Sequence, residues 1–104
     1  MKDDQWRIRF VSSRALKEWN AAKDREPGIM ESVEQLLRHN PRDRSVNSRR
    51  LGPLAHRTIS FHGKRFKIWQ YEMTSGGRIW YLVDDDTIVV IVTSVSLSHP
   101  RKTD

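Results

Sequence analysis

The first forty residues contain two patterns of apolar and polar positions, one typical of a strand and one typical of helices. In residues 6–11, WRIRFV, the apolar Trp6, Ile8 and Phe10 alternate with Arg7 and Arg9, which predicts a strand with one buried face. Ser12 and Ser13 are suitable N-caps for a helix that runs to about Lys23. A second helix is predicted to begin near Pro27 and to end before Pro41. The predicted apolar faces comprise Ala15, Leu16, Trp19 and Ala22 in the first helix and Ile29, Val33, Leu36 and Leu37 in the second.

The second half of the chain has the apolar pattern of strands. Residues 40–56 have no period and many turn formers, so we expect an irregular basic loop there. TSGG and DDD have the composition of hairpin turns. The chain therefore predicts one α+β domain over residues 1–104, in which an N-terminal strand and a helical hairpin pack on a twisted antiparallel β-sheet. The expected strands are RTISF (57–61), FKIWQYEM (66–73), RIWYLV (78–83) and TIVVIVTSV (87–95).

The turns suggest a register for the sheet. If TSGG pairs Met73 with Arg78, then Tyr71 faces Trp80, and a DDD turn that pairs Asp84 with Thr87 places Arg78 opposite Thr93. Because side chains alternate across a sheet, two faces follow. The face expected under the helices holds Phe66, Ile68, Ile79, Tyr81, Val83, Ile88, Val90 and Val92. The other is expected to hold Lys67, Trp69, Tyr71, Arg78, Trp80, Val89, Ile91 and Thr93.

Composition limits the class of protein. The chain has 104 residues and no cysteine, so it offers neither disulfides nor thiolate metal ligands. Its apolar runs are shorter than the about 18 residues of a membrane helix, and its first residues lack the apolar stretch of a signal peptide. We therefore expect a soluble, cytoplasmic protein without a membrane partner.

The positive charge lies in one part of the chain. The formal net charge is +6, yet residues 1–37 carry seven basic and seven acidic side chains. Residues 38–67 carry nine basic side chains against one acidic side chain, Asp43. Such a block is typical of a site for a polyphosphate or an acidic protein, although a solvated loop has the same composition.

Several motifs resemble those of the RelE/ParE superfamily, the toxins of type II toxin–antitoxin systems. They are RLGPL (50–54), WQYE followed by GGRIWYLVDD, and the terminal HPRKT, in this order along almost the whole chain. The resemblance implies a β-sheet flanked by a helical hairpin, no cofactor, and a small acidic antitoxin as partner. It also implies one of two activities, because RelE-like members cut mRNA on the ribosome and ParE-like members inhibit DNA gyrase.

The resemblance also suggests site residues. Arg78 has the place of an arginine found in the ribonucleases, and His99 that of a histidine just past the last strand in some RelE-like members. Continued alternation through Val95 and Leu97 predicts that His99 lies beside Arg78. Both are expected to be catalytic. Phosphate contacts are expected from Arg49, Arg50, Arg65, Lys67, Arg101 and Lys102, and base stacking from Trp69, Tyr71 and Trp80.

Each of these residues has a simpler interpretation. Arg78 could pair with Asp84 or Glu72 on the surface, His99 could belong to a loose tail, and the aromatic residues could be ordinary sheet packing. Glu72 could act as a general base. Asp84, Asp85 and Asp86 resemble a metal cluster, but consecutive side chains diverge, so a turn is expected and no metal.

The sequence thus leaves three functions open. A metal-independent, ribosome-dependent mRNA endonuclease fits Arg78, His99 and the basic loop. A non-catalytic, gyrase-inhibiting toxin is the alternative, because RelE proper has lysines where this chain has Trp69 and Tyr71. An inactive relative that binds only an antitoxin or RNA is the third.

Overall fold

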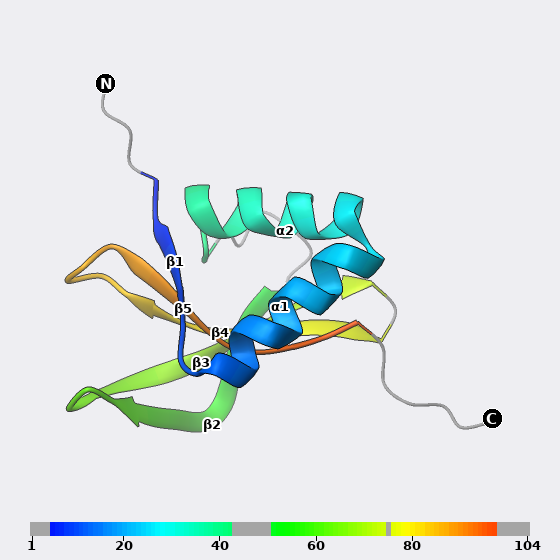
Figure 1. The fold of residues 1–104 in the computed structure, drawn as a ribbon. Helices are drawn as coiled ribbons and strands as arrows, with labels where there is room; N and C mark the ends of the chain where they lie inside the picture. The colour runs from blue at the N-terminus through cyan, green and yellow to red at the C-terminus, as the bar shows by residue number, and fades with distance from the viewer. Residues whose placement is uncertain (1–4, 43–50, 75, 98–104) are drawn as a thin grey trace.

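Two helices and five strands make up the fold. The computed structural model describes residues 5–42, 51–74 and 76–97, with the backbone alone for residues 51–56. Figure 1 shows the helices together on one side of the strands. In chain order the elements are β1 (Arg7–Phe10), α1 (Ser13–Arg25), α2 (Pro27–His39), β2 (Leu51–Phe61), β3 (Lys64–Thr74), β4 (Gly77–Asp84) and β5 (Val89–Ser96).

The helical hairpin forms as predicted, but its buried faces differ from the predicted ones at Leu16 and at Met30, which was not predicted to be buried. The hydroxyl of Ser12 accepts a hydrogen bond from the backbone N–H of Ala15 at 3.1 Å, which caps α1. Pro27 lies in the first turn of α2, where its missing N–H costs nothing. Leu16 is 42% exposed, so its predicted burial is wrong. The buried side chains are Ala15, Trp19 and Ala22 in α1 and Met30, Val33 and Leu37 in α2.

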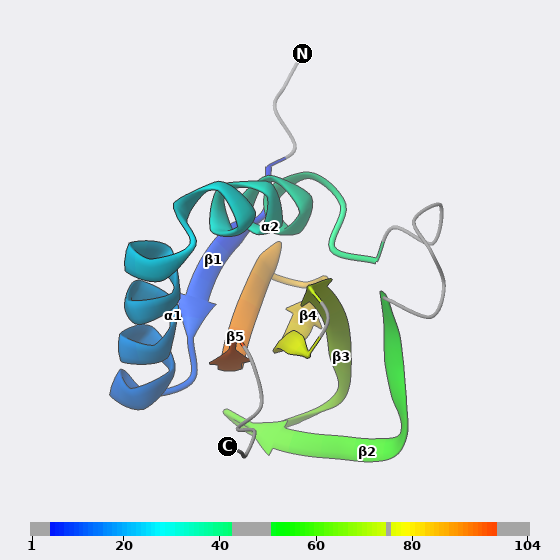
Figure 2. The ribbon, with the colours of Figure 1, turned by 90° about the vertical axis from the view of Figure 1, so that its right-hand side faces the viewer.

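The sheet has the strand order β1-β5-β4-β3-β2. The predicted α+β class is confirmed. Strands β2 to β5 pair antiparallel, whereas β1 runs parallel to β5 and makes the sheet mixed. Figure 2 shows that α1 and α2 cover one face, and that β2 bends so that its later part crosses the other face. We call the face away from the helices the open face. Within the described residues, neither helix is long and apolar enough to cross a membrane.

Strand β2 is longer than expected. The loop predicted for residues 40–56 is wrong for residues 51–56, which belong to this strand. Leu51 pairs with Tyr71 and Pro53 with Trp69. Because β2 is an edge strand, a proline can sit in it without breaking a ladder on both sides.

Two irregularities change the predicted register. The β3–β4 ladder shifts between Glu72 and Thr74, so Glu72, and not Met73, pairs with Arg78. The β4–β5 turn is two residues longer than predicted, since Asp84 pairs with Val89 and not with Thr87. Because the ladder also shifts by one residue between Trp80 and Tyr81, Arg78 pairs with Ser96 and not with Thr93. Each irregularity inserts one residue on one strand, and one residue is enough to exchange the two faces beyond that point.

The core reflects this exchange. The cluster under the helices contains Ile79, Tyr81, Val83, Val90 and Val92, as predicted. Phe66 and Ile68 instead belong to a second cluster on the open face, while Trp69 and Tyr71 pack against the helix-side cluster. The faces predicted for β3 are therefore wrong. Ile88 was also expected in the core, but it lies in the turn before β5 and is 44% exposed.

The same helix-side cluster contains the end of the last described strand. Val95 is buried in it, and Leu97 packs against it. The alternation used to predict that His99 lies beside Arg78 requires Val95 on the open face. Because of the irregularity in β5, Val95 lies on the helix side, so this alternation is wrong. His99 itself lies outside the described residues.

Candidate functional site

Arg78 lies near the start of β4, with its side chain on the open face. Its Nη2 is 2.8 Å from Oε2 of Glu72, its cross-strand partner on β3. The two side chains are 31% and 33% exposed. The pairing with Glu72 that the sequence offered as the simpler interpretation therefore exists. It leaves further guanidinium N–H groups for a phosphate, because arginine has five.

A hollow of about 450 Å3 lies beside this pair on the open face. Trp80, two positions along β4 from Arg78, forms part of its wall, and the indole Nε1 donates to Gln70 Oε1 at 2.8 Å. The hydroxyl of Thr93 donates to the Trp80 carbonyl at 3.1 Å. The hollow thus combines an aromatic ring held in place with polar groups. Its lining comprises Arg57, Ile68, Gln70, Trp80, Thr93 and Ser94.

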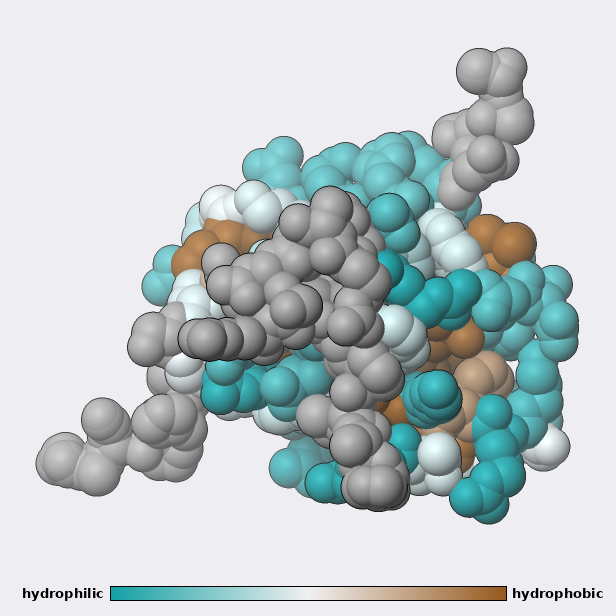
Figure 3. Space-filling model, turned by 180° about the vertical axis from the view of Figure 1, so that it is seen from behind, coloured by the Kyte–Doolittle hydropathy of each residue, from teal (hydrophilic) through white to brown (hydrophobic). Residues whose placement is uncertain are grey.

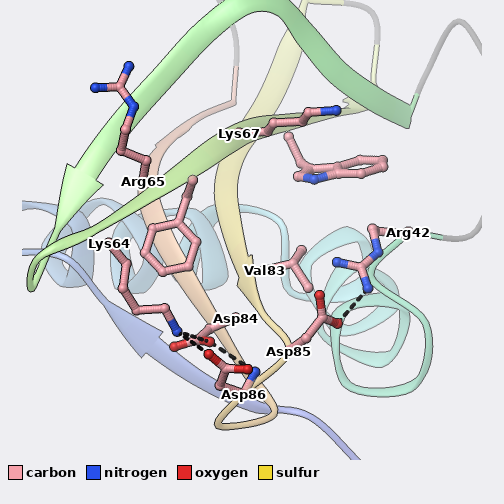
Figure 4. Close-up of a pocket in the computed structure, with 10 residues that line it drawn as sticks. Arg42, Lys64, Arg65, Lys67, Val83, Asp84, Asp85 and Asp86 are labelled. Atoms are coloured by element: carbon pink, nitrogen blue, oxygen red, sulfur yellow. Dashed lines mark hydrogen bonds and ion pairs between the residues drawn. The ribbon is translucent and has the colours of Figure 1, made fainter.

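A second hollow, of about 420 Å3, lies at the turn between β4 and β5. Figure 4 shows Lys64 directed at Asp84 and Asp86, and Arg42 directed at Asp85. The ammonium of Lys64 is 3.0 Å from Asp84 and 2.7 Å from Asp86, and Arg42 is 2.6 Å from Asp85. The three carboxylates are therefore compensated by cations. A turn forms here as predicted, but it comprises residues 85–88, and Asp84 belongs to β4.

These contacts shift two pKa values. Partial burial alone would raise the pKa of Asp84, but hydrogen bonds from Lys64, Thr87 and the N–H of Asp86 hold it below its usual range. The hydrogen bonds to Asp86 and Asp84 raise the pKa of Lys64. Both shifts favour the charged forms, so the cluster is an ion-pair network. Among the described residues, no group of three or more His, Asp or Glu side chains is arranged to hold a metal ion.

The predicted site residues fall into separate places. Arg78 and Trp80 lie together on the open face, whereas Arg65, Lys67 and Trp69 line the hollow at the acidic turn. Tyr71 packs on the helix side. The expectation that all three aromatic residues share a face with Arg78 is therefore wrong. Their roles stay predictions, and so do those of Arg49, Arg50, His99, Arg101 and Lys102, which lie outside the described residues.

The sequence missed several residues of the hollow beside Arg78. Gln70 is not among the predicted site residues, because the predicted register puts Tyr71 opposite Trp80, whereas Gln70 has this place in the structure. Arg57, Thr93 and Ser94 reach the hollow through the bend of β2 and the irregularity in β5. A polar residue between two aromatic ones, as in WQY, is the signal that could have indicated Gln70.

Apolar surface also remains exposed next to charge. Seen from the side opposite to Figure 1, Figure 3 shows apolar residues gathered in a patch with hydrophilic residues around it. The hollow beside Arg78 has this mixture, since the half-buried Ile68 accompanies Arg57 there. Such surfaces suit ligands that present rings together with negative charge.

Comparison with known proteins gives a likeness of structure. No known family model matches the chain, and no curated protein does. A chain in the crystal structure of the intact E. coli RelBE toxin–antitoxin complex is 24% identical, with a TM-score of 0.53, and the match covers 92% of this chain and 99% of that one. A mutant of the E. coli toxin RelE in complex with a peptide of its antitoxin is 27% identical, with a TM-score of 0.47 and coverage of 92% and 86%. On the first of these likenesses, the chain has a RelE-like fold, as its motifs predicted.

Proposed function

We propose that this protein is the toxin of a type II toxin–antitoxin pair and that it acts as a metal-independent, ribosome-dependent mRNA endonuclease. The observation that carries the proposal is the position of Arg78 on the open face, paired with Glu72 and next to a hollow that contains Trp80. A fixed guanidinium, a carboxylate and an aromatic ring are the groups needed to hold a phosphate and the base next to it.

Cleavage through the ribose 2′-hydroxyl requires three proton and charge movements. A base removes the hydroxyl proton, O2′ attacks the adjacent phosphorus, and the bond from phosphorus to O5′ breaks as an acid protonates O5′. The products are a 2′,3′-cyclic phosphate and a 5′-hydroxyl. Arg78 stabilises the charge that builds up on the phosphorane oxygens. Glu72 and His99 are the candidates for the two proton transfers, with histidine better suited to exchange a proton near neutral pH.

The position of Leu97 supports a role for His99. Gly77, which precedes Arg78, is so close to Leu97 that a Cβ atom there would lie 2.6 Å from the Leu97 carbonyl oxygen. Leu97, the last described residue, therefore lies next to the start of β4. His99 follows Leu97 by two positions, a short distance for a chain to cover.

An acidic antitoxin is the partner that we propose. The net charge of +6 favours association with an acidic protein. The E. coli structure that this chain resembles is of a toxin–antitoxin complex, and its likeness over 92% of this chain supports the same kind of partner here. The proposed targets, ribosome and mRNA, place the protein in the cytoplasm.

A growth experiment tests the proposal. Induced wild-type protein is expected to arrest growth and to leave cut mRNA, whereas Arg78→Ala restores both growth and intact mRNA. Arg14→Ala removes the same charge from an 89% exposed side chain on α1 and is expected to arrest growth like the wild type. Growth arrest with intact mRNA and inhibited gyrase supercoiling would replace the endonuclease with the gyrase inhibitor. Unimpaired growth with the wild-type protein would contradict both.

A further inference from the structure

The hollow beside Arg78 contains a hydrogen-bond donor with a defined direction. An indole N–H can only donate, so the atom of Gln70 that meets Trp80 Nε1 at 2.8 Å must be the amide oxygen. The Gln70 amide nitrogen then carries two N–H groups, and no partner for them occurs among the described residues. The side-chain amide therefore presents donors, and not acceptors, to a ligand in the hollow.

Trp80 is held both at its ring and at its backbone. Gln70 holds the indole nitrogen, and the hydroxyl of Thr93 donates to the Trp80 backbone carbonyl at 3.1 Å. Gln70 and Ser94 are the cross-strand neighbours of Trp80 on β3 and β5, so all three belong to one row across the sheet. A ring that is held in this way, and half exposed, loses little conformational freedom when a second ring stacks on it.

Size and spacing fit one nucleotide. The volume of about 450 Å3 falls within the roughly 300–1,000 Å3 of small-molecule sites and far exceeds the ~30 Å3 share of a water molecule. Arg78 follows Trp80 by two residues on the same face, about 6.6 Å along the strand. A base stacked on Trp80 would thus place a neighbouring phosphate at the guanidinium of Arg78. Arg57, which is exposed, also lines the hollow and adds a second cation there.

We propose that this hollow binds one unpaired RNA base, stacked on Trp80 and read through the amide nitrogen of Gln70, with the adjoining phosphate at Arg78. The inference rests on the proposed endonuclease function and assigns to it the place where the substrate is recognised. Gln70 selects bases that have a hydrogen-bond acceptor within reach of its N–H groups. Such an acceptor is either a carbonyl oxygen or an unprotonated ring nitrogen. Base identity at this position thereby affects affinity, and cleavage is not needed for that effect.

Measuring the binding of RNA that cannot be cut tests this inference independently of endonuclease activity. The probe is a set of fluorescein-labelled single-stranded oligonucleotides with 2′-fluoro groups, of oligo-A, oligo-C and oligo-U sequence, followed by fluorescence anisotropy at low salt. Because these oligonucleotides lack the 2′-hydroxyl nucleophile, the measured affinity does not depend on catalysis. Wild-type protein is expected to bind them with unequal affinities.

Three variants give the decisive comparison. Trp80→Leu is expected to weaken binding by about 5- to 150-fold, the range of one base-stacking contact, while Trp80→Phe keeps most of the affinity. Gln70→Met removes the donors at similar size and is expected to reduce the differences between the three sequences. A denaturant midpoint for each variant verifies that it is folded.

The outcomes of the binding experiment decide this inference independently of the growth experiment. Failure of the wild-type protein to bind, or Trp80→Leu binding as tightly as the wild type, overturns the inference even if mRNA is cut in cells. Unchanged base preference in Gln70→Met overturns the role of Gln70. Conversely, a loss of affinity in Trp80→Leu upholds the inference even if the wild-type protein cuts no mRNA.

Discussion

Arg78 and Glu72 face each other across the β3–β4 ladder, with a guanidinium nitrogen and a carboxylate oxygen 2.8 Å apart. About one third of each side chain is exposed, so solvent screens the pair and its contribution to stability is about 0–1 kcal/mol. The pair therefore orients the guanidinium more than it stabilises the fold. A site that contributes little to stability can be changed without unfolding the protein.

The first prediction separates activity from stability at Arg78. Arg78→Ala should abolish growth arrest while its free energy of unfolding stays within about 1 kcal/mol of the wild type. Arg78→Lys should also lose most of the activity, because an ammonium cannot offer the planar fork of donors. Urea unfolding and growth curves are the two measurements. A loss of several kcal/mol in Arg78→Ala would mean that its inactivity reflects unfolding.

The second prediction concerns the close approach of two chain segments at Gly77. A Cβ atom there would lie 2.5 Å from Thr74 Oγ1 and 2.6 Å from the Leu97 carbonyl oxygen. Gly77→Ala should therefore lower the free energy of unfolding by about 1–3 kcal/mol, as overpacking does. Gly28→Ala is the matched control, since nothing lies within 4 Å of its Cβ position in α2, and it should stabilise by about 0.4–1 kcal/mol. Equal effects of the two substitutions would contradict the close approach.

The third prediction concerns a buried hydrogen bond between the sheet and the chain after α2. The hydroxyl of Tyr81 donates to the carbonyl of Pro41 at 2.6 Å, and both residues are buried. Burial raises the pKa of this phenol, which keeps the hydroxyl protonated as a donor. Tyr81→Phe leaves the carbonyl without its donor and should cost about 1–3 kcal/mol in urea unfolding. An unchanged midpoint would show that water replaces the hydroxyl at no cost.

The fourth prediction is a pH dependence of stability at Asp84. Its pKa in the folded protein lies below the ordinary 3.8, so the carboxylate stabilises the fold above that pH. This stability is lost as the pH falls through the lowered pKa. Asp84→Asn should therefore be less stable than the wild type at pH 7, and the difference should shrink below pH 3.8. Urea unfolding of both proteins at pH 7 and below pH 3.8 measures the difference, and an equal difference at the two pH values would contradict this role of Asp84.

How far the sequence predicts this fold depends on the element. The helices follow from local signals, since Ser12 caps α1 and Pro27 begins α2 where composition placed them. Leu16 shows the limit, because helical periodicity fits its burial but its side chain is 42% exposed, in a hollow beside β1. The strands of the second half were also located, because their apolar runs are bounded by turn formers.

Register is the part that the pattern of residues could not determine. One extra residue between Glu72 and Thr74, and one next to Trp80, exchange the faces of β3 and of the end of β5. An inserted residue leaves no signature in polarity when both flanking segments contain apolar side chains. For this reason the sequence predicts the wrong face for Trp69 and Tyr71 and does not indicate Gln70 as a site residue.

The candidate site likewise contains some residues that the sequence indicates and others that only the pairing and bending of the strands reveal. Arg78 could be found because a motif marks it, and its neighbour Trp80 follows two positions later on the same strand. Gln70 and Ser94 belong to the site only through their pairing with Trp80 across the sheet. Arg57 reaches it through the bend of β2, a property of the whole sheet.

Primer extension on ribosome-bound mRNA tests the central claim most directly. Purified protein is added to a reconstituted translation mixture, and the 5′ end of the downstream mRNA fragment is mapped with wild-type protein, Arg78→Ala and Arg14→Ala. Wild type and Arg14→Ala should give the same new cut within the ribosome-bound codons, without added metal beyond that of the mixture, and Arg78→Ala should give none. Intact mRNA with the wild-type protein, or an equal cut with Arg78→Ala, would contradict the account.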